Sequence, residues 1–168
     1  MSDPRHSHHY RLREWAGNVD DHSAPPIDWS AADESGIGPL HALAEEEFLS
    51  GSLPSRAYWR SLCAQAIELG ANPHAAEFEM RNTPLHWCAR HPAPGCIEAL
   101  IDAHACLESA NMQNKTPEAL ARELARDPAL AQALALPIAI LASARERAAI
   151  SSIAPPCLDQ ACPRHDRL

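Results

Sequence analysis

Apolar residues along the chain fall in short helical patterns that are separated by breaks rich in proline and glycine. From about position 39 onward, leucine, isoleucine and alanine recur at spacings of three and four, which places them on one face of a helix. Prolines near the starts and glycines near the ends mark the helix boundaries. We predict helices over 39–49, 55–69, 84–90, a stretch through Ile97, Leu100 and Ile101, 117–124, a stretch from Pro128 through Leu134, and 137–150.

Two of these helices begin at a Thr-Pro pair. The hydroxyl of Thr83 or Thr116 can cap the helix, and Pro84 or Pro117 at the first helical position gives up an N–H that has no partner anyway. Small residues that follow, such as Ala89, let a neighbouring helix approach closely.

The sequence around these pairs is repeated. Asn-Thr-Pro-Leu-His-Trp-Cys-Ala at 82–89 returns as Lys-Thr-Pro-Glu-Ala-Leu-Ala at 115–121, and the threonines at positions 83 and 116 are 33 residues apart. Gly-Pro-Leu-His-Ala-Leu-Ala at 38–44 is a third copy, which begins 45 residues before position 83. A fixed period of this size is typical of stacked helical repeats.

These motifs resemble those of the ankyrin-repeat family, whose period is 33 residues. Each copy is also preceded by a matching approach: Leu-Gly-Ala-Asn-Pro-His at 69–74, Ala-His-Ala-Cys-Leu-Glu at 103–108, and Asp-Glu-Ser-Gly at 33–36, which looks like the family's Asp-x-x-Gly turn. The resemblance covers about residues 27–147. It implies an all-α ankyrin-repeat solenoid of helix-turn-helix units with β-turn or hairpin loops and a C-terminal capping helix.

The resemblance also implies how the chain is divided. We expect a domain over 27–150 with repeats 27–80, 81–113 and 114–147, between a flexible N-terminal segment 1–26 and a flexible tail 151–168. The motif histidines, His41 and His86, are implied to hydrogen-bond across neighbouring turns. Gly38 at the capping position, Arg81 at the turn glycine and Glu118-Ala119 in place of Leu-His depart from the family pattern.

Charge and cysteine usage narrow the classes of function. The net charge is −8, from 22 acidic and 14 basic residues, which disfavours nucleic acid and favours a basic protein partner. We find no secretion signal, and the apolar stretch 129–144 is shorter than a membrane span, so we expect a cytoplasmic, membrane-free protein. Its six cysteines are accordingly expected to be reduced, without a disulfide framework.

Motifs for catalysis are missing from the sequence: it has no phosphate-binding loop, dinucleotide fingerprint, zincin helix or nucleophile elbow. Cys88 beside His86 or His91 is interpreted as a core residue. Cys157, Cys162 and His165, like His6, His8 and His9, are potential metal ligands without a complete four-ligand spacing. We therefore expect no enzyme activity, metal site or cofactor.

The partner surface is implied by the resemblance, since ankyrin proteins usually bind through their turn tips and the concave face of the inner helices. Met80 and Met112 are interpreted as equivalent tip positions that offer an adaptable apolar contact. An acidic stripe is formed by Glu34, Glu45, Glu46, Glu77 and Glu79. Tyr58 and Trp59 are a second potential anchor, with a core role favoured for Trp59. The candidate contacts are Glu34, Ser35, Ile37, Glu45, Glu46, Glu79, Met80, Asn82, Arg90, His91, Met112, Gln113, Lys115 and Glu123.

The sequence thus predicts a monomeric module that binds a protein partner. One concrete form is a bacterial inhibitor or immunity protein whose acidic concave face neutralises a basic toxin. Two alternatives stay open: a secreted bacterial effector that binds a host protein, and a metal-binding or enzymatic protein that uses Cys157, Cys162 and His165.

Overall fold

The structure is a computed structural model that describes residues 28–51 and 54–150, and these residues contain six helices and no strand. The fold is the all-α repeat solenoid that the sequence predicts. The helices are α2 (Pro39–Ser50), α3 (Arg56–Glu68), α4 (Pro84–Arg90), α5 (Pro94–Asp102), α6 (Pro117–Leu124) and α7 (Pro128–Ile150).

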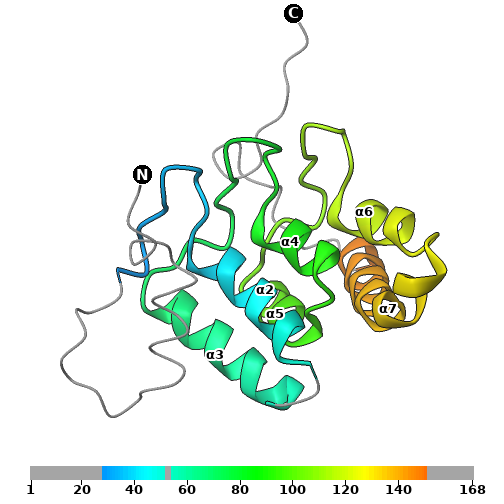
Figure 1. Cartoon of the computed structure of the whole chain (residues 1–168), viewed down its shortest axis with the longest axis horizontal. Coiled ribbons are helices and arrows are strands. Elements are labelled where there is room, and N and C mark those ends of the chain that lie inside the picture. The colour runs from blue at the N-terminus through cyan, green and yellow to red at the C-terminus, as the bar shows by residue number, and fades with distance from the viewer. Residues whose placement is uncertain (1–27, 52–53, 151–168) are drawn as a thin grey trace, which may run out of the picture.

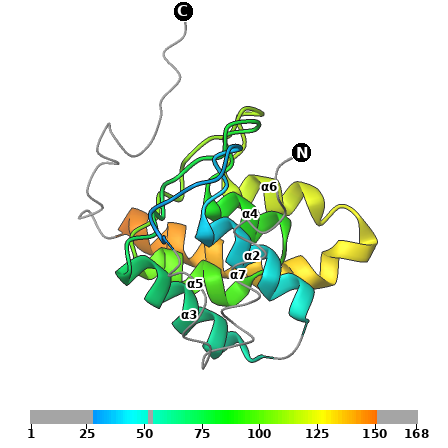
Figure 2. The same cartoon turned by 60° about the vertical axis from the view of Figure 1, so that its left-hand side comes forward.

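The helices form two layers (Figure 1). The inner layer is α2, α4 and α6, and the outer layer is α3, α5 and α7; each inner helix packs on the outer helix of its own repeat and on the inner helix of the next. Three loops project together from the start of the inner helices, as Figure 2 shows from the side. We call these loops the turn tips, and they are turns rather than strands.

Local capping explains where the helices begin. Ser55 caps α3 by accepting a hydrogen bond from Tyr58 N, and Thr116 caps α6 by accepting one from Ala119 N. At the start of α4 the Thr83 hydroxyl lies 2.8 Å from His86 Nδ1, so this threonine contacts the motif histidine. The helix starts at Pro84 and Pro117 therefore match the sequence prediction.

The main core lies between the two layers of the first two repeats. Glu47 of α2 is buried there, and its carboxylate accepts hydrogen bonds from Gly95 N (2.8 Å) and Cys96 N (2.9 Å) at the start of α5. Because Ala93, the residue that precedes α5, has no polar side chain, this carboxylate caps α5 from the neighbouring repeat. Trp59 is only 4% exposed, which confirms its predicted core role.

The C-terminal helix corrects the sequence prediction. Two helices separated near Pro137 were expected, but α7 runs unbroken from Pro128 to Ile150 with Pro137 inside it. Leu134, Pro137 and Leu141 are all buried at spacings of three and four, so packing against α4, α5 and α6 outweighs the lost backbone hydrogen bond. The continuous helix has the length and composition to cross a membrane, so the prediction of a stretch too short for this was wrong; core helices of soluble proteins pass the same test.

The cysteines give a second correction. Cys63, Cys88 and Cys96 are free thiols in the core, as predicted, but Cys106 is disulfide-bonded. The expectation of a chain without disulfides is therefore wrong at this residue. The sequence suggested reduced cysteines, because most of them lie in apolar helical patterns, where cysteine usually behaves as a small hydrophobic residue.

Candidate partner-binding surface

Each turn tip is held in shape by one acceptor side chain at its base. In the first tip, Asp33 Oδ1 accepts hydrogen bonds from Ser35 N (2.8 Å) and Ile37 N (2.9 Å). In the third tip, Asn111 Oδ1 accepts them from Gln113 N (3.0 Å) and Lys115 N (3.1 Å). The first and third tips therefore have the same internal geometry, which an Asp or Asn at the first position favours.

The second tip is one residue longer than the others. The acceptor at its base is Glu77, whose side chain is longer than those of Asp33 and Asn111. The closing backbone hydrogen bond of this tip joins Glu77 N to Asn82 O, across five positions rather than four. The carboxylate of Glu77 accepts hydrogen bonds from the backbone N–H groups of Glu79, Met80 and Asn82. Arg81 adopts φ 56°, which supplies the turn that a glycine usually makes. Glu77 is 6% exposed, so it supports the tip and is not part of an acidic surface stripe.

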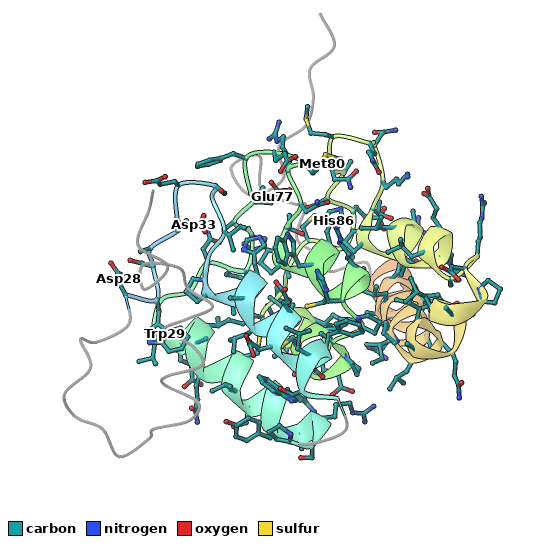
Figure 3. All side chains as sticks on the ribbon, in the orientation of Figure 1. Asp28, Trp29, Asp33, Glu77, Met80 and His86 are labelled. Carbon is teal, nitrogen blue, oxygen red and sulfur yellow. The ribbon has the colours of Figure 1, made fainter. Side chains whose placement is uncertain are left out.

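Backbone hydrogen bonds join the three tips to one another. Phe78 N donates to Ser35 O of the first tip (2.9 Å), and Met112 N of the third tip donates to Met80 O of the second (2.8 Å). In Figure 3, Asp33, Glu77 and Met80 mark the neighbouring first and second tips. The tips therefore form one continuous ledge rather than three separate loops.

The motif histidines fix this ledge to the inner helices. His41 Nε2 contacts Asn82 O (3.2 Å), and His86 Nε2 contacts Lys115 O (2.9 Å). Since Nδ1 of His41 accepts the Gly38 N–H, the proton of the neutral ring lies on Nε2, which donates to the next tip. Burial lowers the pKa of His41 from 6.5 to about 4, although its hydrogen bond to Asn82 opposes that shift, and burial also lowers the pKa of His86. The cross-turn role implied for both histidines is confirmed.

Asn82 is a correction to the predicted contact set. It is 7% exposed, and its side chain is used inside the ledge: Nδ2 donates to Glu77 Oε1 (3.1 Å), and Oδ1 accepts from Asn111 Nδ2 (2.9 Å). A residue with both ends of its amide engaged in this way links the second and third tips and is not available to a partner.

The outward side chains of the ledge differ from those expected. Met80 and Met112 are not equivalent: the residue that occupies the position of Met112 in the second tip is Phe78, because each directly follows the acceptor at the base of its tip. Phe78 is 72% exposed and Met112 is 55% exposed, whereas Met80 is half-buried. Glu34 occupies the same position in the first tip and is exposed. Phe78 was missed because a lone aromatic residue between two acids carries no periodic signal.

The inner helices carry a cluster of aromatic rings that extends to their C-terminal ends, away from the turn tips: Phe48 lies in the last turn of α2, and His91 directly follows α4. The ring centroids of Trp87 and His91 are 5.6 Å apart, and those of Phe48 and His91 are 5.8 Å apart. Trp87 also makes an edge contact with the buried His41 at 5.5 Å. Phe48 is 41% exposed, and His91 and Trp87 are half-buried. This apolar cluster includes only one predicted contact, His91, because Phe48 was assigned to the inner helix without a surface role.

The charged residues among the predicted contacts carry both signs. Glu79 and Arg90 are exposed, while Glu45 and Glu46 are half-buried. Lys115 and Glu123 form an ion pair with each other. The other tip candidates are exposed or half-buried: Ser35, Ile37 and Gln113.

The candidate catalytic and metal-binding residues gain no support. Burial raises the pKa of the Cys88 thiol, which disfavours the thiolate that a nucleophile needs. Over residues 28–51 and 54–150, no group of three or more potential ligands is placed to hold a metal ion. Cys157, Cys162 and His165, together with His6, His8 and His9, lie outside the described residues.

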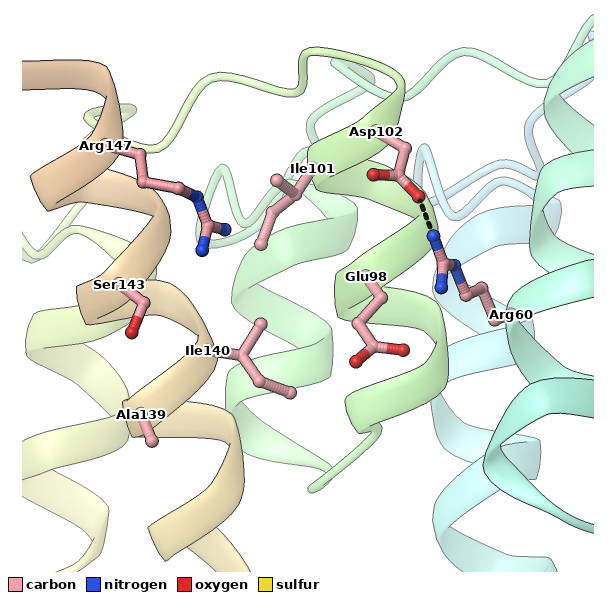
Figure 4. Close-up of a pocket in the computed structure, with 8 residues that line it drawn as sticks. All are labelled: Arg60, Glu98, Ile101, Asp102, Ala139, Ile140, Ser143 and Arg147. Atoms are coloured by element: carbon pink, nitrogen blue, oxygen red, sulfur yellow. Dashed lines mark hydrogen bonds and ion pairs between the residues drawn. The ribbon is translucent and has the colours of Figure 1, made fainter. Parts of the chain in front are cut away.

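A hollow on the outer layer is an alternative surface (Figure 4). It has a volume of about 390 Å³ and lies between α5 and α7, with Ile101 and Ile140 among its lining residues. At one side Arg60 donates to Asp102 at 2.7 Å, so this charge is already paired. Tyr58, the predicted second anchor, is 39% exposed on α3, but it does not line this hollow.

Comparisons with known proteins agree with the fold. No family model matches the chain. Over 89 residues the chain is 33% identical to protein fem-1 homolog A of Bos taurus, 32% to that of Rattus norvegicus and 30% to that of Homo sapiens. Each alignment covers 49% of this chain and 13% of the relative, so the chain matches a small part of those proteins. These relatives support an ankyrin-repeat family over about half of the chain, and with it a protein-interaction module in general.

Proposed function

We propose that the chain binds one protein partner on the ledge formed by its turn tips and on the adjoining face of α2, α4 and α6. The observation that carries this proposal is that different residues of the tips hold the backbone in place and face the solvent. Buried acceptors and cross-tip hydrogen bonds fix the backbone, while the side chains of Glu34, Phe78, Glu79 and Met112 stay exposed. A surface that is fixed before binding loses little conformational entropy when a partner docks.

The partner that fits this surface best is basic. Glu34 and Glu79 are exposed on adjacent tips, Glu45 and Glu46 lie on the neighbouring helix, and the chain as a whole carries a charge of −8. Complementary charge would raise the rate of association and disfavour acidic partners. Apolar anchors at Phe78 and Met112 would supply binding energy that charge alone does not.

The biological form that we propose first is an inhibitor or immunity protein that covers a basic bacterial toxin. Its support is the combination of acidic charge and a binding ledge that is fixed by backbone hydrogen bonds. Ankyrin-repeat relatives are typically interaction modules rather than enzymes, and we assign no catalytic step to the chain. The alternative is an effector that uses the same ledge on a host protein, and the identity of the partner separates the two forms.

The test is affinity capture with the full chain in extracts of its native organism, followed by identification of the bound protein. We expect one dominant basic partner, bound less tightly as salt concentration rises. The double substitution Glu79→Lys with Met80→Ser should reduce capture at least about tenfold. The melting temperature should change by less than about 4 °C, since neither side chain is buried.

A matched control is Glu146→Lys, which makes the same charge change at an exposed position on α7 in the outer layer. Capture should be unaffected by this substitution. An equal loss of capture for Glu146→Lys, or undiminished capture for the ledge double variant, would place the partner elsewhere. Capture that falls only together with the melting temperature would show that the ledge residues act through folding.

A further inference from the structure

The ledge presents a row of three side chains with defined chemistry. Glu34, Phe78 and Met112 each follow the acceptor at the base of their tip, so they occupy the same position in three successive tips. The N–H groups of Phe78 and Met112 donate to the preceding tip, which fixes the order of the row. The row therefore reads acid, aromatic ring and thioether along the solenoid.

Two of these side chains are apolar and face water. Phe78 is 72% exposed and Met112 is 55% exposed, which places both among the more exposed large apolar side chains of the described residues. The ring of Phe78 lies over Gly36, where an added Cβ would be 3.0 Å from Cδ1 and Cε1 of the ring. Phe78 is thus positioned against Gly36 of the first tip, and most of its side chain stays exposed to a partner.

We propose that this row selects a partner segment that presents one basic side chain to Glu34 and two apolar side chains to Phe78 and Met112. This inference rests on the proposed function and specifies which chemistry the ledge recognises. Charge complementarity orients the segment, because the acid lies at one end of the row only. The aromatic ring and the thioether supply contact area, with the flexible methionine adapting to the shape of the partner.

The stacking of repeats sets the spacing that the segment needs. Packed helices lie about 8–10 Å apart. Each tip leads into an inner helix, so we infer that successive tips have about the same spacing as these helices. A polyproline II helix places every third residue on the same side at about 9.3 Å, from three residues of about 3.1 Å each. A peptide of this kind therefore presents side chains at about the spacing of Glu34, Phe78 and Met112.

The probe is the synthetic peptide Arg-Pro-Pro-Leu-Pro-Pro-Leu-Pro-Pro, titrated into isotopically labelled full chain and followed by two-dimensional NMR. We expect the amide signals of the three tips to shift in a saturable way. Phe78→Ser should raise Kd at least about tenfold. The matched control Tyr58→Ser, which removes an exposed aromatic ring from the outer layer, should leave Kd unchanged.

The most discriminating experiment reverses the charge of Glu34 and compares peptides with opposite charges. Glu34→Lys should weaken the arginine peptide and strengthen a peptide with Glu in place of Arg, each by about three- to tenfold, because Glu34 is exposed and its ion pair is screened. A peptide with the same composition but with Leu at every second position should bind less tightly, since its side chains miss the tip spacing.

Three results would overturn the inference: no shifts at the tips at millimolar peptide, equal binding of the respaced peptide, or no effect of Glu34→Lys on the choice between the Arg and Glu peptides. None of these results decides the proposed function. A native partner that is lost with Glu79→Lys and Met80→Ser but unaffected by Phe78→Ser would leave the ledge as a binding surface and refute only the row.

Discussion

Acid should weaken the fold through the buried histidines that tie the tips to the inner helices. The pKa of His41 falls from 6.5 to about 4 in the folded chain because the ring is buried. The unfolded chain therefore holds this proton more tightly, and the stability that His41 contributes is complete above pH 6.5 and is lost as the pH falls toward 4. With these two pKa values, a change from pH 8 to pH 5 costs about 2 kcal/mol. His86 shifts in the same direction and adds to the loss.

The measurement is urea unfolding at pH 8 and pH 5, followed by circular dichroism, for the native chain and for His41→Gln. Glutamine keeps a donor and an acceptor but does not titrate, so the variant should lose about 2 kcal/mol less than the native chain between the two pH values. Burial raises the pKa of Glu47, which stabilises the fold as the pH falls, but this effect is common to both proteins and cancels in the difference.

The control is His104→Asn, which removes an exposed histidine at a position of φ 58° that asparagine tolerates. This variant separates the effect of removing a surface histidine from the effect of removing the buried one. If His41→Gln loses as much stability as the native chain between pH 8 and pH 5, the buried histidine is not the group responsible, and the reasoning from its desolvation is refuted.

Three further substitutions test the packing that positions the ledge, each by urea unfolding. Glu47→Ala leaves the N–H groups of Gly95 and Cys96 without their acceptor and should cost about 2–4 kcal/mol; a cost below about 0.5 kcal/mol would contradict the capping role. Gly95→Ala places a Cβ 2.6 Å from Arg56 O and should cost at least about 2 kcal/mol, unless α3 and α5 separate freely. Arg81→Gly relieves the strain of the positive φ and should stabilise the fold by about 0.5–1 kcal/mol. Destabilisation would show that contacts of the arginine side chain outweigh this strain.

The sequence predicts the short helices well because their boundaries are encoded locally. Pro84 and Pro117 start α4 and α6, and both helices end at the expected residues, Arg90 and Leu124. The signals responsible, a capping residue and a proline at the first helical position, act within one turn of the helix. Tertiary contacts are not needed to choose between helix and loop at these places.

The long C-terminal helix shows where local signals fail. Pro137 is a helix breaker by propensity, yet it is buried inside α7 in line with Leu134 and Leu141. The helix continues because three neighbouring helices hold its apolar face, a contact that the sequence order does not reveal.

Glu77 and Glu79 show why the binding surface is harder to predict than the fold. They are the same residue type two positions apart, yet Glu77 is 6% exposed and binds three backbone N–H groups, while Glu79 is exposed. Glu77 is buried because the second tip has an extra residue, and its long side chain reaches the backbone N–H groups of that longer tip. An interpretation from sequence alone treats both residues as exposed negative charges and therefore overstates the negative charge on the surface of the ledge. Because only Glu34 and Glu79 are exposed acids on the tips, the choice of partner there depends on where charge lies beside Phe78 and Met112, more than on the total charge.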